Sequence, residues 1–220
     1  MERQHFLNDA KHSAKTPETE GHKNLRKLLE GNKRFIEGIR SVEPLLAHKK
    51  MPDLAAQGQK PFAVVLTCSD SRSPVELIFD QGVGDLFVVR VAGNVVAPSL
   101  LASIEFAVAN FGSPLILVLG HTQCGAVKAT VDHVCDSSKA LPSPHLEELV
   151  GRIRPSIDLT EGVCDQKSAE FLSRATITNV RRSMNLIQEQ SRIVRDLLAS
   201  GQLEIAGGIL DISNGRVAVI

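Results

Sequence analysis

The sequence predicts an α/β fold: an open, mainly parallel sheet of about four strands, a C-terminal antiparallel edge strand, and helices on both faces. Three observations predict it. Short, nearly continuous runs of apolar and β-branched residues are typical of strands that are buried on both faces, as in parallel sheets. Segments long enough for helical crossovers separate these runs. An Asn-Gly pair near the C-terminus is typical of a hairpin turn.

The N-terminal part of the chain predicts an arm followed by a helix. Residues 1–21 are polar and charged without hydrophobic periodicity, so we expect a mobile arm there and one domain over residues 22–220. Apolar residues then recur at helical spacing between His22 and Gly38, which predicts an amphipathic helix. A weaker helical pattern covers about Pro44 to Ala56.

The central part alternates between strands and helices. The apolar runs predict three strands, at Phe62–Thr67, Leu86–Val91 and Leu115–Leu119. A short helix is expected over Val75–Asp80. A longer one is expected over Pro98–Phe111, because proline suits the first turn of a helix and Gly112 follows its end.

The C-terminal part predicts further helices and the end of the sheet. Helical patterns occur near Ala126–Val134, His145–Arg154 and Ser168–Ser200, the last of which we expect to be broken. Leu203–Leu210 predicts another parallel strand. The turn at Asn214-Gly215 precedes Arg216–Ile220, which we expect to form the antiparallel edge strand.

The composition excludes several classes of partner. The 220 residues carry 25 Lys plus Arg against 25 Asp plus Glu, so the chain lacks the basic excess of nucleic-acid-binding proteins. No apolar run reaches the roughly 18 residues of a transmembrane helix, and the N-terminus shows no apolar export segment. We therefore expect a cytoplasmic protein with a small-molecule substrate, no nucleic acid and no membrane partner.

The four cysteines, at positions 68, 124, 135 and 164, form no C-x-x-C pair. A cytoplasmic chain of this length needs no disulfide to fold. We expect Cys135 and Cys164 to be ordinary thiols, because neither has a His or Cys partner at metal-ligand spacing. A single Cys at a strand end is usually a small buried hydrophobic residue.

Two predicted strands end in residues that can bind a metal. The first strand runs into C-S-D-S-R at Cys68–Arg72, and the third runs into G-H-T-Q-C-G at residues 120–125. Ligands of open α/β sheets bind outside the carboxyl ends of the strands. Two thiolates and an imidazole are a ligand set that zinc prefers, and three protein ligands leave a fourth position for water. The sequence therefore predicts Zn²⁺ at Cys68, His121 and Cys124.

Asp70 and Arg72 follow the first cysteine at alternate positions, so an extended backbone would place them on its side of the chain. Zinc with two thiolate ligands acidifies a bound water less than an all-histidine site does, so a further acceptor is needed. Arg72 would hold the Asp70 carboxylate ionised and aimed at the water or hydroxide on zinc. The alternative is a loop salt bridge that caps a helix near Ser73-Pro74.

Together, C-S-D-S-R and the later H-x-x-C-G resemble the β-class carbonic anhydrases, and the resemblance extends from about Leu25 to the C-terminus. It implies that the two cysteines and the histidine bind zinc and that Asp70 and Arg72 form the family's dyad. The implied reaction is the reversible hydration of carbon dioxide to bicarbonate and a proton. In some members the Asp of the dyad moves onto zinc and blocks the site.

The resemblance also implies a substrate pocket. Gln59 resembles a family glutamine that faces substrate, Phe87 matches a pocket aromatic, and Phe106 stands where many members carry Tyr. Pockets of the family are shared between two subunits, which implies a homodimer or homotetramer.

Other functions remain open on the sequence alone. Relatives with the same zinc site hydrolyse carbon disulfide or carbonyl sulfide, and the sequence does not separate linear substrates of similar size. A non-catalytic zinc-binding paralogue would keep the fold without turnover. A redox thiol enzyme would leave His121 and Asp70 unexplained. His133 and His145 are candidates for proton relay, although a surface histidine without such a role is more common.

Overall fold

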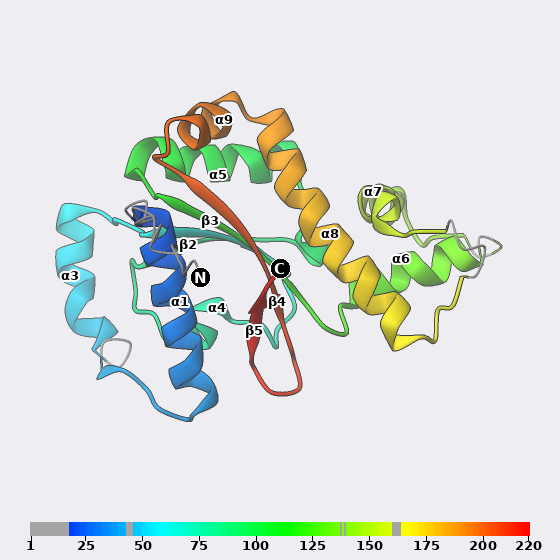
Figure 1. Ribbon diagram of the computed structural model, residues 1–220, viewed down its shortest axis with the longest axis horizontal. Helices are drawn as coiled ribbons and strands as arrows, with labels where there is room; N and C mark the ends of the chain where they lie inside the picture. The colour runs from blue at the N-terminus through cyan, green and yellow to red at the C-terminus, as the bar shows by residue number, and fades with distance from the viewer. Residues whose placement is uncertain (1–17, 43–45, 137, 139, 160–163) are drawn as a thin grey trace, which may run out of the picture.

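A five-stranded sheet forms the centre of the computed structural model, which describes residues 18–42, 46–136, 138, 140–159 and 164–220 (Figure 1). The order of the strands is β2-β1-β3-β4-β5. Their bounds are β1 Ala63–Thr67, β2 Leu86–Arg90, β3 Leu115–His121, β4 Glu204–Leu210 and β5 Val217–Val219. β1 to β4 are parallel and β5 pairs with β4 antiparallel, which confirms the predicted α/β fold.

The two central strands, β1 and β3, are buried along their whole length. Alternate side chains of β1 enter different cores, because successive residues of a strand point to opposite faces. Val64 and Leu66 pack in one core with residues of three helices, whereas Ala63 and Val65 pack in the other with residues of two. Burial on both faces explains why the strand sequences are continuous apolar runs rather than alternating patterns.

Helices cover both faces of the sheet (Figure 1). One face carries α1 (Glu20–Ile36) and α4 (Val75–Ile78), and the other carries α5 (Pro98–Phe111), α8 (Ala169–Gln190) and α9 (Arg192–Ala199). The remaining helical segments are α3 (Ala47–Gln57), α6 (Gly125–Cys135), α7 (Pro144–Ile153), η1 (Ala92–Asn94) and η2 (Arg154–Ser156). Within the described ranges, no helix is long and apolar enough to cross a membrane.

The first helix begins two residues before its predicted start, at Glu20. The Thr19 side chain caps it by accepting a hydrogen bond from the amide of His22, which supplies one of the acceptors that the first turn lacks. Of the arm predicted over residues 1–21, residues 1–17 lie outside the described part of the chain.

The predicted break in the last long helical stretch occurs at Ser191, between α8 and α9. Ser191 is fully buried and has extended backbone angles. Its hydroxyl accepts a hydrogen bond from the amide of Val194 and donates one to Glu105 at 2.6 Å, so the residue caps α9 and ties it to α5.

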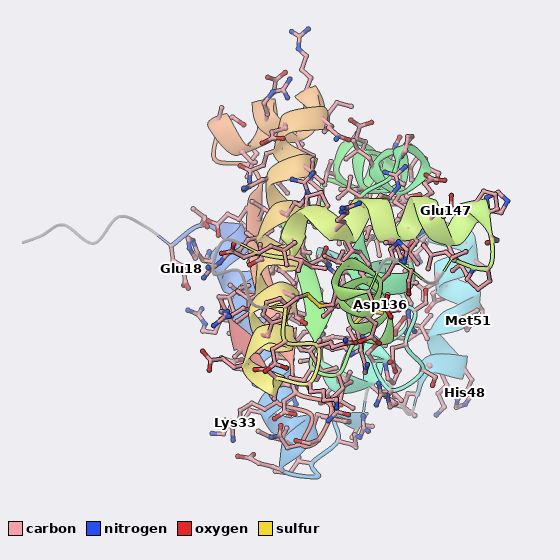
Figure 2. The ribbon with its side chains drawn as sticks, turned by 90° about the vertical axis from the view of Figure 1, so that its right-hand side faces the viewer. Glu18, Lys33, His48, Met51, Asp136 and Glu147 are labelled. Atoms are coloured by element: carbon pink, nitrogen blue, oxygen red, sulfur yellow. A yellow bond between two sulfur atoms is a disulfide. The ribbon has the colours of Figure 1, made fainter. Side chains whose placement is uncertain are left out.

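Cys135 and Cys164 form a disulfide, so the prediction that they are ordinary thiols is wrong. Cys135 is the last residue of α6, and Cys164 lies in the segment before α8. Asp136, which is labelled in Figure 2, follows Cys135 directly in the sequence. The two residues are 29 positions apart and form no local motif, so only the packing of these helices brings them together. Disulfides are more frequent in oxidising compartments, and the expected cytoplasmic location stays a prediction.

Gly31 marks the closest approach of α1 to the segment after α4, where an added Cβ would overlap the carbonyl oxygen of Phe79. We expect Gly31→Ala to lower the free energy of unfolding by about 2 kcal/mol or more, because backbone on both sides must move. Gly151 of α7 is a matched control with open space around it, and Gly151→Ala should raise the same quantity by up to about 1 kcal/mol. Urea unfolding measures both, and equal effects would contradict the packing described.

The disulfide closes a large loop, so its removal should destabilise the fold. We expect Cys135→Ser with Cys164→Ser to lower the free energy of unfolding by about 3–4 kcal/mol, since loop-closure entropy in the unfolded chain is regained. Denatured, metal-free parent protein should react with a thiol reagent at Cys68 and Cys124 only. Four reactive thiols in unreduced protein would contradict the assignment, and reductant should shift the urea midpoint of the parent but not of the double variant.

Candidate metal centre

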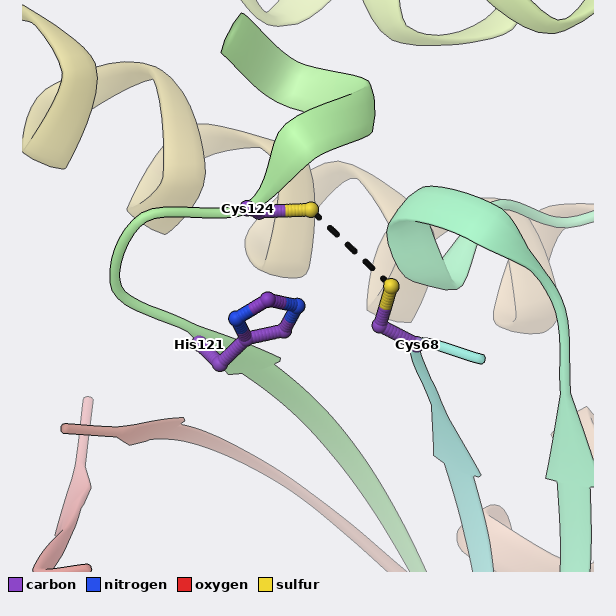
Figure 3. A group of neighbouring side chains, drawn as sticks. All are labelled: Cys68, His121 and Cys124. Atoms are coloured by element: carbon purple, nitrogen blue, oxygen red, sulfur yellow. Dashed lines mark hydrogen bonds between the residues drawn. The ribbon is translucent and has the colours of Figure 1, made fainter. Parts of the chain in front are cut away.

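The carboxyl ends of β1 and β3 bring three predicted ligands together (Figure 3). Cys68 follows β1, His121 ends β3, and Cys124 is the N-cap residue of α6. One ligand atom from each residue lies within 4.8 Å of the others, and the two sulfur atoms are 4.0 Å apart. The three residues are 5%, 1% and 3% exposed. In the described part of the chain, no other His, Cys, Asp and Glu side chains form such a group.

The donor atoms fit a metal ion. His121 Nε2 is buried without a hydrogen-bond partner, whereas Nδ1 lies 2.9 Å from the carbonyl oxygen of Thr122. A carbonyl oxygen can only accept, so Nδ1 carries the proton and Nε2 keeps a free lone pair. A buried lone pair beside two buried sulfur atoms is a costly arrangement in the absence of a ligand, and it suits a soft divalent cation.

One of the two cysteines, Cys68, is biased toward ionisation. The thiol of Cys124 donates to the sulfur of Cys68, and this contact lowers the pKa of Cys68, to about 4, against the burial that opposes ionisation. His121 and the amide of Gly93, at 3.3 Å, act on that sulfur in the same direction. The same contact between the sulfur atoms raises the pKa of Cys124. One thiolate of the pair is thus stabilised by the fold itself.

Gly93 has a structural reason to be glycine. Its φ of 71° lies in the left-handed region, and an added Cβ would be 2.7 Å from Ile153 Cδ1. This conformation aims its amide at the sulfur of Cys68.

Asp70 and Arg72 form a two-point ion pair beside the ligands. Arg72 donates from Nε to Asp70 Oδ1 at 2.9 Å and from Nη2 to Oδ2 at 2.7 Å, and its amide also donates to Oδ1. The guanidinium holds the pKa of the Asp70 carboxyl well below its usual range. Asp70 Oδ2 lies 3.8 Å from His121 Nε2, so the carboxylate faces the ligand cluster.

The alternative helix-capping role of Asp70 does not match the geometry. The short helix that follows, α4, has Pro74 at its N-cap position and no side-chain capping bond. The hydrogen bonds that the Asp70 carboxylate accepts come from Arg72.

Arg90 shapes the loop that carries Cys68 and Asp70, a role that the sequence analysis did not predict. Arg90 ends β2, where it is paired in register with Thr67. Its guanidinium donates to the carbonyl oxygen of Cys68 at 3.1 and 3.2 Å and to that of Asp70 at 2.7 Å. The sequence feature that could have indicated this role is an arginine at the carboxyl end of the strand beside β1.

The three other predicted site residues lie away from the ligands of the same chain. Gln59 precedes β1, and Phe87 pairs with Val64 near the start of β2, about 13 Å along the strand from Cys68. Phe106 of α5 lies against Phe87, with 6.3 Å between ring centroids, and is 51% exposed. The ligands are therefore at the carboxyl end of the sheet, and these residues are at its amino end.

A cavity of about 620 Å³ borders the ligand cluster between α6 and α8. Cys124 and Val127 line it from α6, and Leu172 and Thr176 line it from α8. The disulfide ties the far end of α6 to the segment before α8, so it joins the two walls of this cavity covalently.

Comparisons with known proteins identify the family of the chain. The family model described as carbonic anhydrase matches residues 63–217. Carbonic anhydrase 2 of Mycobacterium tuberculosis (strain H37Rv) is 39% identical over 192 residues, which cover 87% of this chain and 89% of the relative. A carbonic anhydrase of Mycolicibacterium smegmatis is 38% identical over 190 residues, with 86% and 88% covered.

Solved structures show the same fold. A tetrameric β-carbonic anhydrase of Sordaria macrospora is similar with a TM-score of 0.68 and 25% identity, over 90% of this chain and 97% of that one. The β-carbonic anhydrase CafA of Aspergillus fumigatus gives a TM-score of 0.70 and 26% identity, with 90% of each chain covered. The family model and the mycobacterial relatives both extend over most of the sequence, and the chain belongs to the β-carbonic anhydrase family.

Proposed function

We propose that Cys68, His121 and Cys124 hold Zn²⁺ and that the protein hydrates carbon dioxide reversibly to bicarbonate and a proton beside Asp70. The proposal rests above all on the buried, unpartnered Nε2 of His121 next to two buried sulfur atoms. Zinc accepts this mixed sulfur and nitrogen set in tetrahedral sites and tolerates an open fourth position. When bound, Zn²⁺ acts as a Lewis acid that makes water a nucleophile near neutral pH.

Asp70 is placed to orient the attacking water. Its carboxylate is ionised because Arg72 donates to both oxygens, and an ionised carboxylate can only accept hydrogen bonds. Each oxygen has a further lone pair, so Oδ2 can accept from water while it stays bound to Arg72. This hydrogen bond would turn a lone pair of the water toward the carbon of the substrate.

Arg72 and Arg90 serve as positioning residues in this proposal. Arg72 fixes the carboxylate, and Arg90 fixes the backbone on both sides of Ser69 through the carbonyl oxygens of Cys68 and Asp70. The acceptor is thus held by fixed hydrogen bonds before substrate arrives, which reduces the reorganisation needed during the reaction.

We further propose that a second copy of the chain completes the substrate pocket. Gln59 and Phe87 lie at the far end of the strands from the ligands, and Phe106 exposes half of its surface there. A partner copy that contributed these residues would line the metal centre with apolar rings, as an uncharged gas requires. The Sordaria macrospora relatives, which are described as tetrameric, support assembly of the chain into at least a dimer.

Removal of a ligand and removal of the acceptor should have different effects. We expect Cys68→Ala to lose the bound zinc, whereas Asp70→Asn should keep zinc and lose about 100-fold or more in kcat, because an oriented hydrogen-bond acceptor is lost. Metal analysis and stopped-flow hydration measure the two properties. Asp196→Asn on the exposed face of α9 is the control and should match the parent. Parent-like turnover of Asp70→Asn would refute the role of Asp70, and zinc-loaded parent without any hydration would refute the function.

The shared pocket can be tested by subunit complementation. Cys68→Ala has no metal site but intact pocket residues, and Phe87→Ala with Phe106→Ala has an intact metal site. If the pocket is completed in trans, mixed dimers contain one intact centre, so co-refolding the two variants should restore hydration well above that of either variant alone. If mixtures that demonstrably contain mixed dimers showed no recovery of hydration, the proposal of a shared pocket would be wrong. The two rings would then contribute to the site of their own chain or to no site.

A further inference from the structure

A second polar cavity, with a volume of about 200 Å³, lies between α7, α8 and the segment that follows η1. Arg152 lines it from α7, and Asn179, Arg182, Ser183 and Gln190 line it from one face of α8. None of the ligands, dyad residues or expected pocket residues borders it. The proposed reaction therefore gives this cavity no role.

Two buried polar side chains of the cavity wall have hydrogen-bond partners within the protein. Asn179 and Ser183 are each 2% exposed. Asn179 Nδ2 donates to the carbonyl oxygen of Gly93 at 2.8 Å, and Ser183 Oγ donates to that of Asn94 at 3.0 Å. These two side chains build a fixed wall and need no ligand.

The charge of Arg152 is balanced as well. Its Nη1 donates to the carbonyl oxygen of Val96 at 2.8 Å, and its Nε and Nη2 donate to Glu148 at 3.2 and 2.6 Å. Arg152 therefore closes one side of the cavity without leaving a free cation.

Arg182 is different, because its Nε is buried and has no hydrogen-bond partner. Among the described residues, no carboxylate lies within ion-pair distance of its guanidinium. A buried donor on a cationic group that stays unsatisfied is destabilising. The cavity thus contains one uncompensated positive charge and at least one donor that needs an acceptor.

We propose that this cavity binds a singly charged oxyanion of the carboxylate class through Arg182. The planar guanidinium matches a carboxylate with two parallel hydrogen bonds. One uncompensated charge favours a monoanion over a dianion, and the volume is below the roughly 300 Å³ at which drug-sized ligand sites begin. Bicarbonate and small organic carboxylates share this chemistry. Only the choice of bicarbonate rests on the proposed function, since it is the product of that reaction.

The cavity wall is connected to the metal centre. Asn179 holds the carbonyl oxygen of Gly93, and the amide of the same residue donates to the sulfur of Cys68. The anion site and the thiolate therefore share one segment, η1, although they share no lining residue.

The direct test is a crystal of the zinc-loaded protein soaked in acetate. We expect planar carboxylate density beside Arg182 in the parent and in Arg181→Gln, and none in Arg182→Gln. Arg181 is the matched control because it precedes Arg182 on α8, carries the same charge and is exposed. Density that persists in Arg182→Gln, or is absent from the parent, would overturn the proposal.

A solution test identifies the class of anion. Acetate, bicarbonate and phosphate are titrated separately at constant ionic strength, and thermal unfolding of the folded variants is followed. Acetate or bicarbonate should raise the Tm of the parent and of Arg181→Gln, with at least tenfold weaker apparent affinity in Arg182→Gln. Anions that bind at zinc affect all three proteins equally, so the difference isolates the cavity.

The relative affinities then decide the source of the ligand. Tighter binding of bicarbonate would point to the product, and tighter binding of acetate would point to organic carboxylates. Preference for phosphate would contradict the single-charge argument, and equal responses of all three proteins would mean that water alone satisfies Arg182. Loss of hydration activity with anion binding intact would refute the proposed function but not this site.

Discussion

The parallel pairing of β1 with β3 is the constraint on which the metal centre depends. Their register sets Thr67 against Leu119, so the residue after β1 is level with the last residues of β3. This places Cys68 beside His121 without any long loop. A shift of the pairing by two residues would move the ligands apart by about 7 Å, beyond the reach of one metal ion. The buried apolar runs on both faces hold the register in place.

The carboxyl edge of the sheet carries polar groups that the fold does not satisfy by itself. His121 Nε2 has no hydrogen-bond partner, and the sulfur atoms of Cys68 and Cys124 contact each other and, at Cys68, the amide of Gly93. Burial of such groups is costly, and a metal that binds only the folded state returns that free energy. The surrounding groups are satisfied, in contrast: Arg72 binds Asp70, and Arg90 binds the loop backbone. The centre is therefore a rigid frame around a few unsatisfied atoms.

Local patterns were sufficient to predict the strands, a break somewhere within Ser168–Ser200 and the edge strand, because each depends on residues that are neighbours in the sequence. The ligand cluster was predictable because its members follow two strands. The disulfide was not, since the pairing of Cys135 with Cys164 depends on how α6 packs near α8. The positioning role of Arg90 was not predicted, because its partners are backbone oxygens, which carry no sequence signature. Phe87 and Phe106 were assigned to the pocket by resemblance. Within one chain, they lie at the opposite end of the strands from the metal ligands.

The disulfide also turns part of the chain into a covalent ring. The ring encloses α7, whose Val150 and Ile153 are buried in the fold and whose Arg152 closes the second cavity. A single backbone cut between the two cysteines would leave both new ends attached to the same molecule. Proteolysis in this region would thus break the backbone without separating α6 from α8. New termini engineered there would have the same effect. Chain length and sequence can vary in the exposed parts of this ring while the walls beside Cys124 stay joined.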